Sequence, residues 1–263
     1  RTRIKHQTGA VRITGFDLDY LSAGVDEEKA AGRAKFAYFI LSSLVGRVDG
    51  SARGALFDVV DKGLDAKADN VLFSVSDAKA PWHTDGASAE KAYDCVGLLC
   101  INPASEGGTL HLSNAAAALG TLNGSLPKFI VNELLRPLPR DILENGSGQG
   151  VSNGDLIRFA RSPHLLPLRV RHNAFPIFAV GSKGDDLIRF RYMRQWIESG
   201  HEKSHLPVSP LLEVAMNALD GALDQEKLCS TKMEAGDIMF CNNTSLAPAR
   251  DSFRQHRGAA PRR

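Results

Sequence analysis

Short stretches in which apolar and polar residues alternate, together with brief β-prone apolar runs, predict many strands. Successive side chains of a strand point to opposite faces, so alternation indicates a sheet with one buried face. These stretches lie at residues 10–18, 55–60, 71–75, 93–101, 109–113, 155–159, 175–180, 187–192 and 235–243. The turn Gly181-Ser182-Lys183-Gly184 joins two of them, which is typical of a hairpin.

Two longer segments follow helical spacing instead. Residues 26–48 open with acidic side chains and carry four apolar ones at helical spacing, so we expect that face to lie in a core. The four are Phe36, Phe39, Ile40 and Leu44. Ser209 and Pro210 form a helix start before an apolar stripe that ends near residue 224.

The order of these segments predicts the architecture. No repeat or linker divides the chain, so we expect a single domain over residues 1–263, with a helical insertion around residues 194–224. Many short strands with few helices predict a mainly β protein, an antiparallel sandwich or barrel with flanking helices packed outside it.

Charge and composition exclude several classes of protein. A formal charge of +2 and a pI near 8.4 are too mild a bias to predict nucleic acid as a partner. The longest apolar run, residues 34–46, is too short to cross a bilayer, so we expect a buried helix there and no membrane partner. The four cysteines lack CxxC spacing, which favours a reducing, cytoplasmic location. The oligomeric state is not indicated. Because the sequence starts without Met and ends on Pro-Arg-Arg, we expect a piece of a longer polypeptide.

Residues 81–86 (PWHTDG) carry the strongest chemical signal. On extended backbone His83 and Asp85 point to the same side, where an imidazole and a carboxylate can bind one divalent cation. Together they would supply two thirds of a facial triad, the ligand set of non-haem Fe(II) oxygenases. An HxD triplet also arises by chance, so the alternative is an exposed histidine beside a solvated aspartate.

Further blocks in a fixed order give the chain its resemblance to a known family. They are residues 82–87 (WHTDGA), 97–115 (GLLCINPASEGGTLHLSNA), 178–192 (FAVGSKGDDLIRFRY) and 236–243 (GDIMFCNN). In this order the chain resembles the taurine dioxygenase-like, clavaminate synthase-like Fe(II)/2-oxoglutarate-dependent oxygenases. The resemblance implies a double-stranded β-helix, or jelly roll, with His83 and Asp85 as iron ligands and Thr109 near the carboxylate of 2-oxoglutarate. Gly107 and Gly108 fit a close approach that a side chain would obstruct.

One departure from the family pattern concerns the second ligand histidine. In relatives it stands just before an Ala/Gly-Arg pair, and here that place is taken by Pro248, which has no metal-binding side chain. Since proline also lacks an N–H, the local strand must differ or lie at an edge. Three outcomes stay open. His256, or a polar group such as Asn243 or Asp251, fills the position; water fills it; or iron binding is lost.

The resemblance also implies sites for the cosubstrate and the substrate. A basic residue about fourteen or fifteen positions after the second histidine pairs with 2-oxoglutarate, and counting from Pro248 reaches Arg262 and Arg263. Substrate-binding candidates are Phe73, Ser74, Trp82 and Arg191. The expected reaction uses O2 to hydroxylate or desaturate a small molecule such as an amino acid, an amine or a secondary metabolite. The alternative is a degenerate jelly roll that lost the histidine and acts as a binding or interaction protein.

Overall fold

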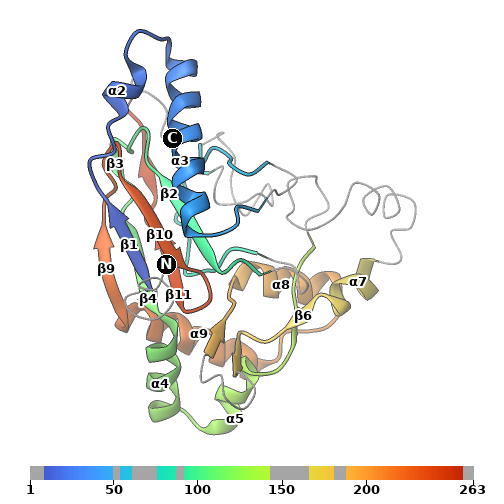
Figure 1. Ribbon diagram of the computed structural model, residues 1–263. Helices are drawn as coiled ribbons and strands as arrows, with labels where there is room; N and C mark the ends of the chain where they lie inside the picture. Colours follow the sequence, from blue (N-terminus) through green and yellow to red (C-terminus); the bar gives the residue numbers. More distant parts are fainter. Residues whose placement is uncertain are drawn as a thin grey trace.

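Two antiparallel three-stranded sheets form the centre of the computed structural model, which describes residues 9–49, 54–60, 76–86, 92–142, 166–180 and 188–256 (Figure 1). The first sheet has the order β1-β10-β2, from β1 (Ala10–Ile13), β10 (Ile238–Asn242) and β2 (Cys95–Leu99). The second has the order β11-β4-β9, from β11 (Leu246–Arg250), β4 (Leu110–Asn114) and β9 (Lys227–Thr231). Three two-stranded pairs complete the described strands: β3 (Glu106–Gly107) with β12 (Phe253–Arg254), β5 (Leu138–Pro139) with β6 (Ala174–Phe175), and β7 (Phe178–Val180) with β8 (Ile188–Phe190).

The inner faces of the two sheets pack against each other through apolar side chains. Leu110 and Leu112 of β4 meet Met239 and Cys241 of β10 in one buried cluster, which Leu246 of β11 joins. Alternation along each strand therefore leaves the second face of each sheet for helices.

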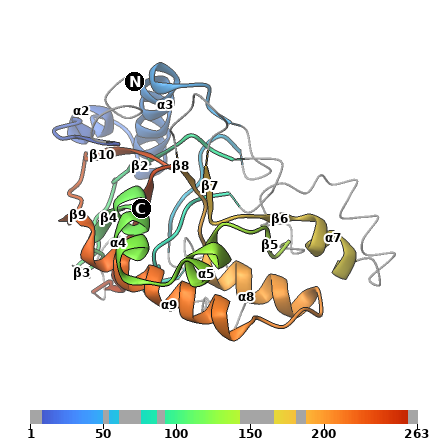
Figure 2. The same cartoon turned by 90° about the horizontal axis from the view of Figure 1, so that it is seen from below.

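Helices cover both outer faces (Figure 2). On the first sheet lies α3 (Glu27–Val45), preceded by α2 (Leu18–Ser22), and the Tyr38 ring stacks on Phe240 with 6.0 Å between centroids. On the second sheet, Ala247 and Ala249 of β11 pack into the core formed with α4 (Ala115–Ser125) and α9 (Pro210–Gln225). The remaining described helices are α5 (Lys128–Val131), the 3-10 helix η2 (Asn132–Leu134), α7 (Leu166–His172) and α8 (Arg194–Lys203). None of the helices in the described ranges is long and apolar enough to span a membrane.

Most of the predicted elements are present. Strands β1, β2 and β10 lie within the stretches predicted from alternation, β4 extends one residue beyond its stretch, and β7 and β8 form the expected antiparallel pair. Residues 55–60 form no strand, and residues 71–75 and 155–159 lie outside the described part of the chain. Two helices, α8 and α9, occupy the region of the expected insertion, while the single-domain organisation stays a prediction. Helices contribute more of the described residues than strands do, so "mainly β" fits the two central sheets and not the described part of the chain as a whole.

The expected buried face of the first long helix is wrong. In α3 the buried residues are Ala31, Ala34 and Tyr38, whereas Phe36 is 68% exposed and Leu44 76% exposed. The sheet selects this face because Gly97 of β2 leaves room there: a Cβ at Gly97 would collide with the Tyr38 hydroxyl and the Phe240 ring. Apolar residues occur all around this helix, so periodicity alone does not identify the side that packs.

Candidate functional site

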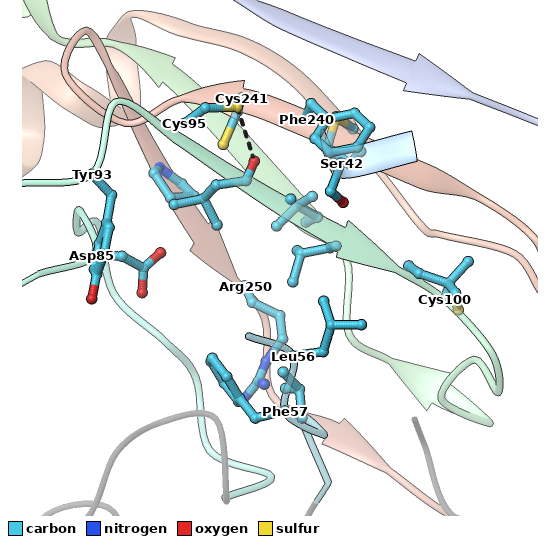
Figure 3. Close-up of a pocket in the computed structure, with 18 of the residues that line it drawn as sticks. Ser42, Leu56, Phe57, Asp85, Tyr93, Cys95, Cys100, Phe240, Cys241 and Arg250 are labelled. Carbon is cyan, nitrogen blue, oxygen red and sulfur yellow. Dashed lines mark hydrogen bonds between the residues drawn. The ribbon is translucent and has the colours of Figure 1, made fainter. Parts of the chain in front are cut away.

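A cavity of about 670 Å³, here called the central cavity, is lined by both sheets, by α3 and by the segment that carries the HxD pair (Figure 3). His83, Asp85, Pro248 and Arg250 all line it. Much of the rest of its wall is apolar, with Leu98, Leu110, Leu112 and Met239 among the lining side chains. The two halves of the sequence signature, some 160 residues apart, therefore meet at one cavity.

The side chains of residues 82–85 point alternately to the central cavity and to the helical core. His83 and Asp85 line the central cavity, as their spacing predicts. Trp82 is buried in the core shared with α4 and α9, where its indole N–H donates to Asp224 at 3.1 Å. Thr84 is also buried, and its backbone N–H donates to the Tyr192 carbonyl at 2.6 Å. Packing on the helical side thus fixes the direction of the two polar side chains.

A backbone hydrogen bond fixes which ring nitrogen of His83 faces a carbonyl oxygen. Nδ1 lies 2.7 Å from the Pro81 carbonyl oxygen. A carbonyl can only accept, so Nδ1 carries the proton and donates, and the lone pair of neutral imidazole is on Nε2. Histidines that bind metal through Nε2 are typically oriented by this kind of bond from the other ring nitrogen.

Asn243 holds the backbone at Asp85. Its Oδ1 accepts from the Asp85 N–H at 2.8 Å, and its Nδ2 donates to the carbonyls of Asp85 at 2.9 Å and Tyr93 at 3.0 Å. Within the described ranges, neither carboxylate oxygen of Asp85 accepts a hydrogen bond, so the backbone is fixed while the carboxylate is available to a cation. Figure 3 shows Asp85 and Tyr93 side by side at one end of the cavity.

Asn243→Ala is expected to lower both the stability of the fold and the affinity for Fe(II). Loss of three buried hydrogen bonds should lower the free energy of unfolding by about 2 kcal/mol, measured by urea denaturation. Loss of Asp85 positioning should weaken Fe(II) binding by about tenfold, measured by anaerobic titration. Asn217→Ala, whose side chain bonds Arg194 on the helical side, is the matched control and should leave Fe(II) binding unchanged. Unchanged Fe(II) binding in Asn243→Ala would contradict a positioning role.

The thiols beside Asp85 stay protonated at neutral pH. Burial, followed by the neighbouring Cys95 thiol and the Asp85 carboxylate, raises the pKa of Cys241 to about 12. Burial is also the largest cause that raises the pKa of Cys95, to about 11. Neither thiol is therefore a ready thiolate ligand or nucleophile. None of the four cysteines forms a disulfide within the described residues.

Pro248 lies beside His83 in the wall of the cavity. Along β11, Leu246 joins the interior cluster and Pro248 and Arg250 line the cavity, whereas Ala247 and Ala249 point to the helical side. The His83 N–H donates to the Pro248 carbonyl at 3.0 Å. β11 is an edge strand of its three-stranded sheet, as the missing proline N–H predicts, and on its outer side the segment that carries His83 pairs with it through the bridge between Ala80 and Arg250.

The structure does not bring the expected third ligands to His83 and Asp85. The His256 imidazole is exposed and lies 2.9 Å from Glu106 at the β3–β12 edge. Asp251 lies 3.1 Å from His111, and the Asn243 amide is occupied by the backbone bonds described above. Over the described ranges, no three His, Cys, Asp or Glu side chains are grouped to hold a metal ion. Two donors of a facial triad fit, and the third is not supplied by these residues.

The expected cosubstrate and substrate residues are also placed differently. Thr109 does not line the cavity, because Leu110 and Leu112 point inward and Thr109 holds the alternate position; its carbonyl accepts from Asp251 N–H at 2.9 Å. Trp82 points into the core, and Arg191 reaches the Gly86 carbonyl at 3.2 Å, outside the cavity lining. The other four, Phe73, Ser74, Arg262 and Arg263, lie outside the described residues.

Comparison with known proteins gives a family and several structural relatives. The family model described as "Taurine catabolism dioxygenase TauD, TfdA family" matches residues 1–263. The non-heme iron oxygenase OrfP is similar, with 17% identity and a TM-score of 0.63 over 97% of this chain and 74% of that one. An asparagine oxygenase, solved with Fe(II), 2S,3S-3-hydroxyasparagine and succinate, has 17% identity and a TM-score of 0.64 over 97% and 72%. Comparison with curated proteins gives no match.

Proposed function

Because the chain belongs to the taurine catabolism dioxygenase TauD, TfdA family, we propose that it is a non-haem Fe(II)/2-oxoglutarate-dependent oxygenase. The observation that carries the proposal is the pair formed by His83 Nε2 and the Asp85 carboxylate at one cavity. The two facing sheets are then part of a double-stranded β-helix. The substrate is a small molecule, with O2 as the co-reactant. An amino acid is the class we favour, since OrfP was solved with Fe, succinate and (3S)-hydroxy-L-Arg.

The proposal assigns each protein group one task. With Fe(II) bound, the site would let O2 oxidise 2-oxoglutarate and the substrate together, giving succinate, CO2 and the hydroxylated substrate. His83 offers Nε2, oriented by the Pro81 carbonyl. Asp85 offers its carboxylate, positioned by Asn243. The apolar wall limits access of water, which strengthens electrostatic interactions inside the cavity.

Pro248 leaves one protein ligand position without a donor. We propose that water takes this position, so that His83 and Asp85 are the two side-chain ligands. An oxygenase with one donor fewer should bind iron weakly, because each ligand contributes to affinity. A cytoplasmic location is part of the proposal and agrees with four cysteines that form no disulfide within the described residues.

Anaerobic reconstitution tests the proposal. Adding Fe(II) and 2-oxoglutarate to the protein should produce a visible charge-transfer band, and admitting O2 should produce succinate. His83→Ala and Asp85→Ala should each lose both signals. His172→Ala is the matched control, because this exposed ring bonds its own helix at Leu168, and it should keep both signals. A parent protein with neither band nor succinate after fresh reconstitution would contradict the proposal.

A second function is favoured by one observation, the proline in the ligand position. The chain would then keep the fold and bind a small molecule without oxidising it. Binding of 2-oxoglutarate to metal-free protein by calorimetry, without succinate formation when iron is present, would distinguish this function from the first.

A further inference from the structure

A serine, a histidine and an aspartate form a hydrogen-bonded row on the face of the second sheet opposite to Leu110 and Leu112. Ser230 of β9 lies directly across from His111 of β4 in the strand pairing, and its Oγ is 2.7 Å from His111 Nδ1. On the other side of the ring, His111 Nε2 is 3.1 Å from Asp251 Oδ2. None of the three is among the described residues that line the central cavity, so the row is separate from the candidate metal ligands.

The aspartate distinguishes the two nitrogens of the His111 ring. An ionised carboxylate only accepts hydrogen bonds, so a neutral ring donates to Asp251 from Nε2. The lone pair of the ring then lies on Nδ1, where the Ser230 hydroxyl donates its proton. A hydroxyl bonded to an imidazole that a carboxylate orients is the arrangement that activates a serine as a nucleophile. Such a triad is defined by geometry and not by the order of its residues in the chain.

The surroundings hold the histidine ring in place and leave the serine open to solvent. β4 is the central strand of its sheet, and the side chain of His111 is only 13% exposed. The Trp82 ring contacts it edge-on, with 6.3 Å between the ring centroids. The Asp251 N–H donates to the Thr109 carbonyl at 2.9 Å, which fixes the backbone of the aspartate. Ser230, in contrast, lies exposed on the edge strand β9 (Figure 1), so it is accessible from solution.

The position of Ser230 on an edge strand limits the chemistry that the row supports. Alternate backbone N–H groups of such a strand face away from the sheet and are available as donors. Donors aimed at a developing oxyanion usually make the largest single contribution to acyl transfer, and a serine hydrolase supplies two of them. An open strand edge is a weaker stabiliser than such a preorganised pair. The acyl donors that fit are therefore esters with a good leaving group, and not amides.

We propose that Ser230 is an activated nucleophile that accepts acyl groups from activated esters, with His111 as general base and Asp251 orienting the ring. The Ser230 Oγ forms a bond to the ester carbonyl carbon while its proton passes to His111 Nδ1. The bond to the leaving oxygen then breaks, and the leaving group departs with the electron pair while the imidazolium returns its proton to water. The product is acylated Ser230. Neither iron nor O2 takes part, so the proposal does not rest on the oxygenase function.

The test uses p-nitrophenyl acetate on the full chain without added metal. Absorbance follows the release of p-nitrophenolate, and peptide mass spectrometry locates the acetyl groups. Ser230 should be acetylated about 100-fold faster than Ser43, the contribution expected of a general base. Ser43 is the matched reference, because it is exposed on α3 and its hydroxyl donates to the Phe39 carbonyl instead of a histidine.

Three variants test the role of each member of the row. Ser230→Ala should lose this acetylation site and the corresponding release of p-nitrophenolate. His111→Asn keeps a polar side chain across from the serine but supplies no base, so acetylation of Ser230 should slow by about 100-fold. Asp251→Asn should slow it as well, because an amide N–H donates to Nε2 and favours the ring tautomer that cannot accept from the serine. Ser43→Ala should react at Ser230 as the parent does.

Three results would overturn the proposal. The first is acetylation of Ser230 in the parent no faster than that of Ser43. The second is an unchanged rate at Ser230 in a folded His111→Asn protein or in Asp251→Asn, which would reduce the row to a set of structural hydrogen bonds. The third is full release of p-nitrophenolate by Ser230→Ala, which would make the imidazole itself the nucleophile. Circular dichroism shows whether each variant is folded, and Asp251→Asn decides the second result if His111→Asn is not.

Discussion

Replacing Pro248 by histidine is expected to strengthen Fe(II) binding by about 10- to 100-fold, the scale on which groups that support a metal site act. Pro248 and Arg250 line the central cavity from β11, so a side chain at residue 248 points into the same space as His83 and Asp85. A neutral imidazole there would supply the third donor of a facial triad. Anaerobic competition with a coloured Fe(II) chelator measures the change.

Pro248→Ala separates the missing donor from the rigid ring. Alanine restores the backbone N–H at the sheet edge but supplies no ligand, so its Fe(II) affinity should equal that of the parent. An equal gain in Pro248→Ala and Pro248→His would mean that backbone geometry limits the site. A folded Pro248→His protein with unchanged affinity would show that residue 248 does not reach the metal.

The sequence predicts the fold best where the information is local. Alternation at residues 109–113 is enough to find β4 and to distinguish Leu110 and Leu112 from the outward His111. The HxD spacing likewise predicts that His83 and Asp85 share a side, because the period of a strand is independent of what it packs against. The start of α9 follows from Ser209, whose hydroxyl accepts from the Leu212 N–H at 3.1 Å.

Features that depend on contacts between two distant segments cannot be predicted from local sequence patterns. The packed face of α3 depends on the space over Gly97, which lies about sixty residues further along the chain. Trp82 precedes a candidate ligand and was expected at the substrate, yet Asp224 of α9 draws its indole into the core. The stack of Arg140 and Arg191 on Phe175 joins three segments, and no spacing in the sequence announces it. The Asn243 bonds to Asp85 also join distant segments, although an asparagine that follows a buried strand is a usable signal.

The largest loss of stability is expected from Gly107→Ala, which should lower the free energy of unfolding by about 3 kcal/mol. Gly107 has φ +67, a left-handed conformation that costs other residues about 1–2 kcal/mol. A Cβ there would also collide with the Ser252 carbonyl oxygen, which accepts from the Gly108 N–H at 3.0 Å. Moving that carbonyl breaks the bond at a further cost of about 1 kcal/mol. Urea denaturation measures the loss.

Gly120→Ala is the control for the change of residue itself. Gly120 lies inside α4 with open space around its Cα, so alanine there should raise the free energy of unfolding by about 0.5–1 kcal/mol through helix propensity. Both variants add the same methyl group, so a loss of stability at residue 107 and a gain at residue 120 would show that the backbone conformation and the nearby carbonyl cause the loss. If Gly107→Ala were as stable as the parent, the turn between β11 and β12 would not approach β3 as described. The wall of the cavity next to Arg250 would then need another explanation, because Gly107 and Gly108 form part of its lining.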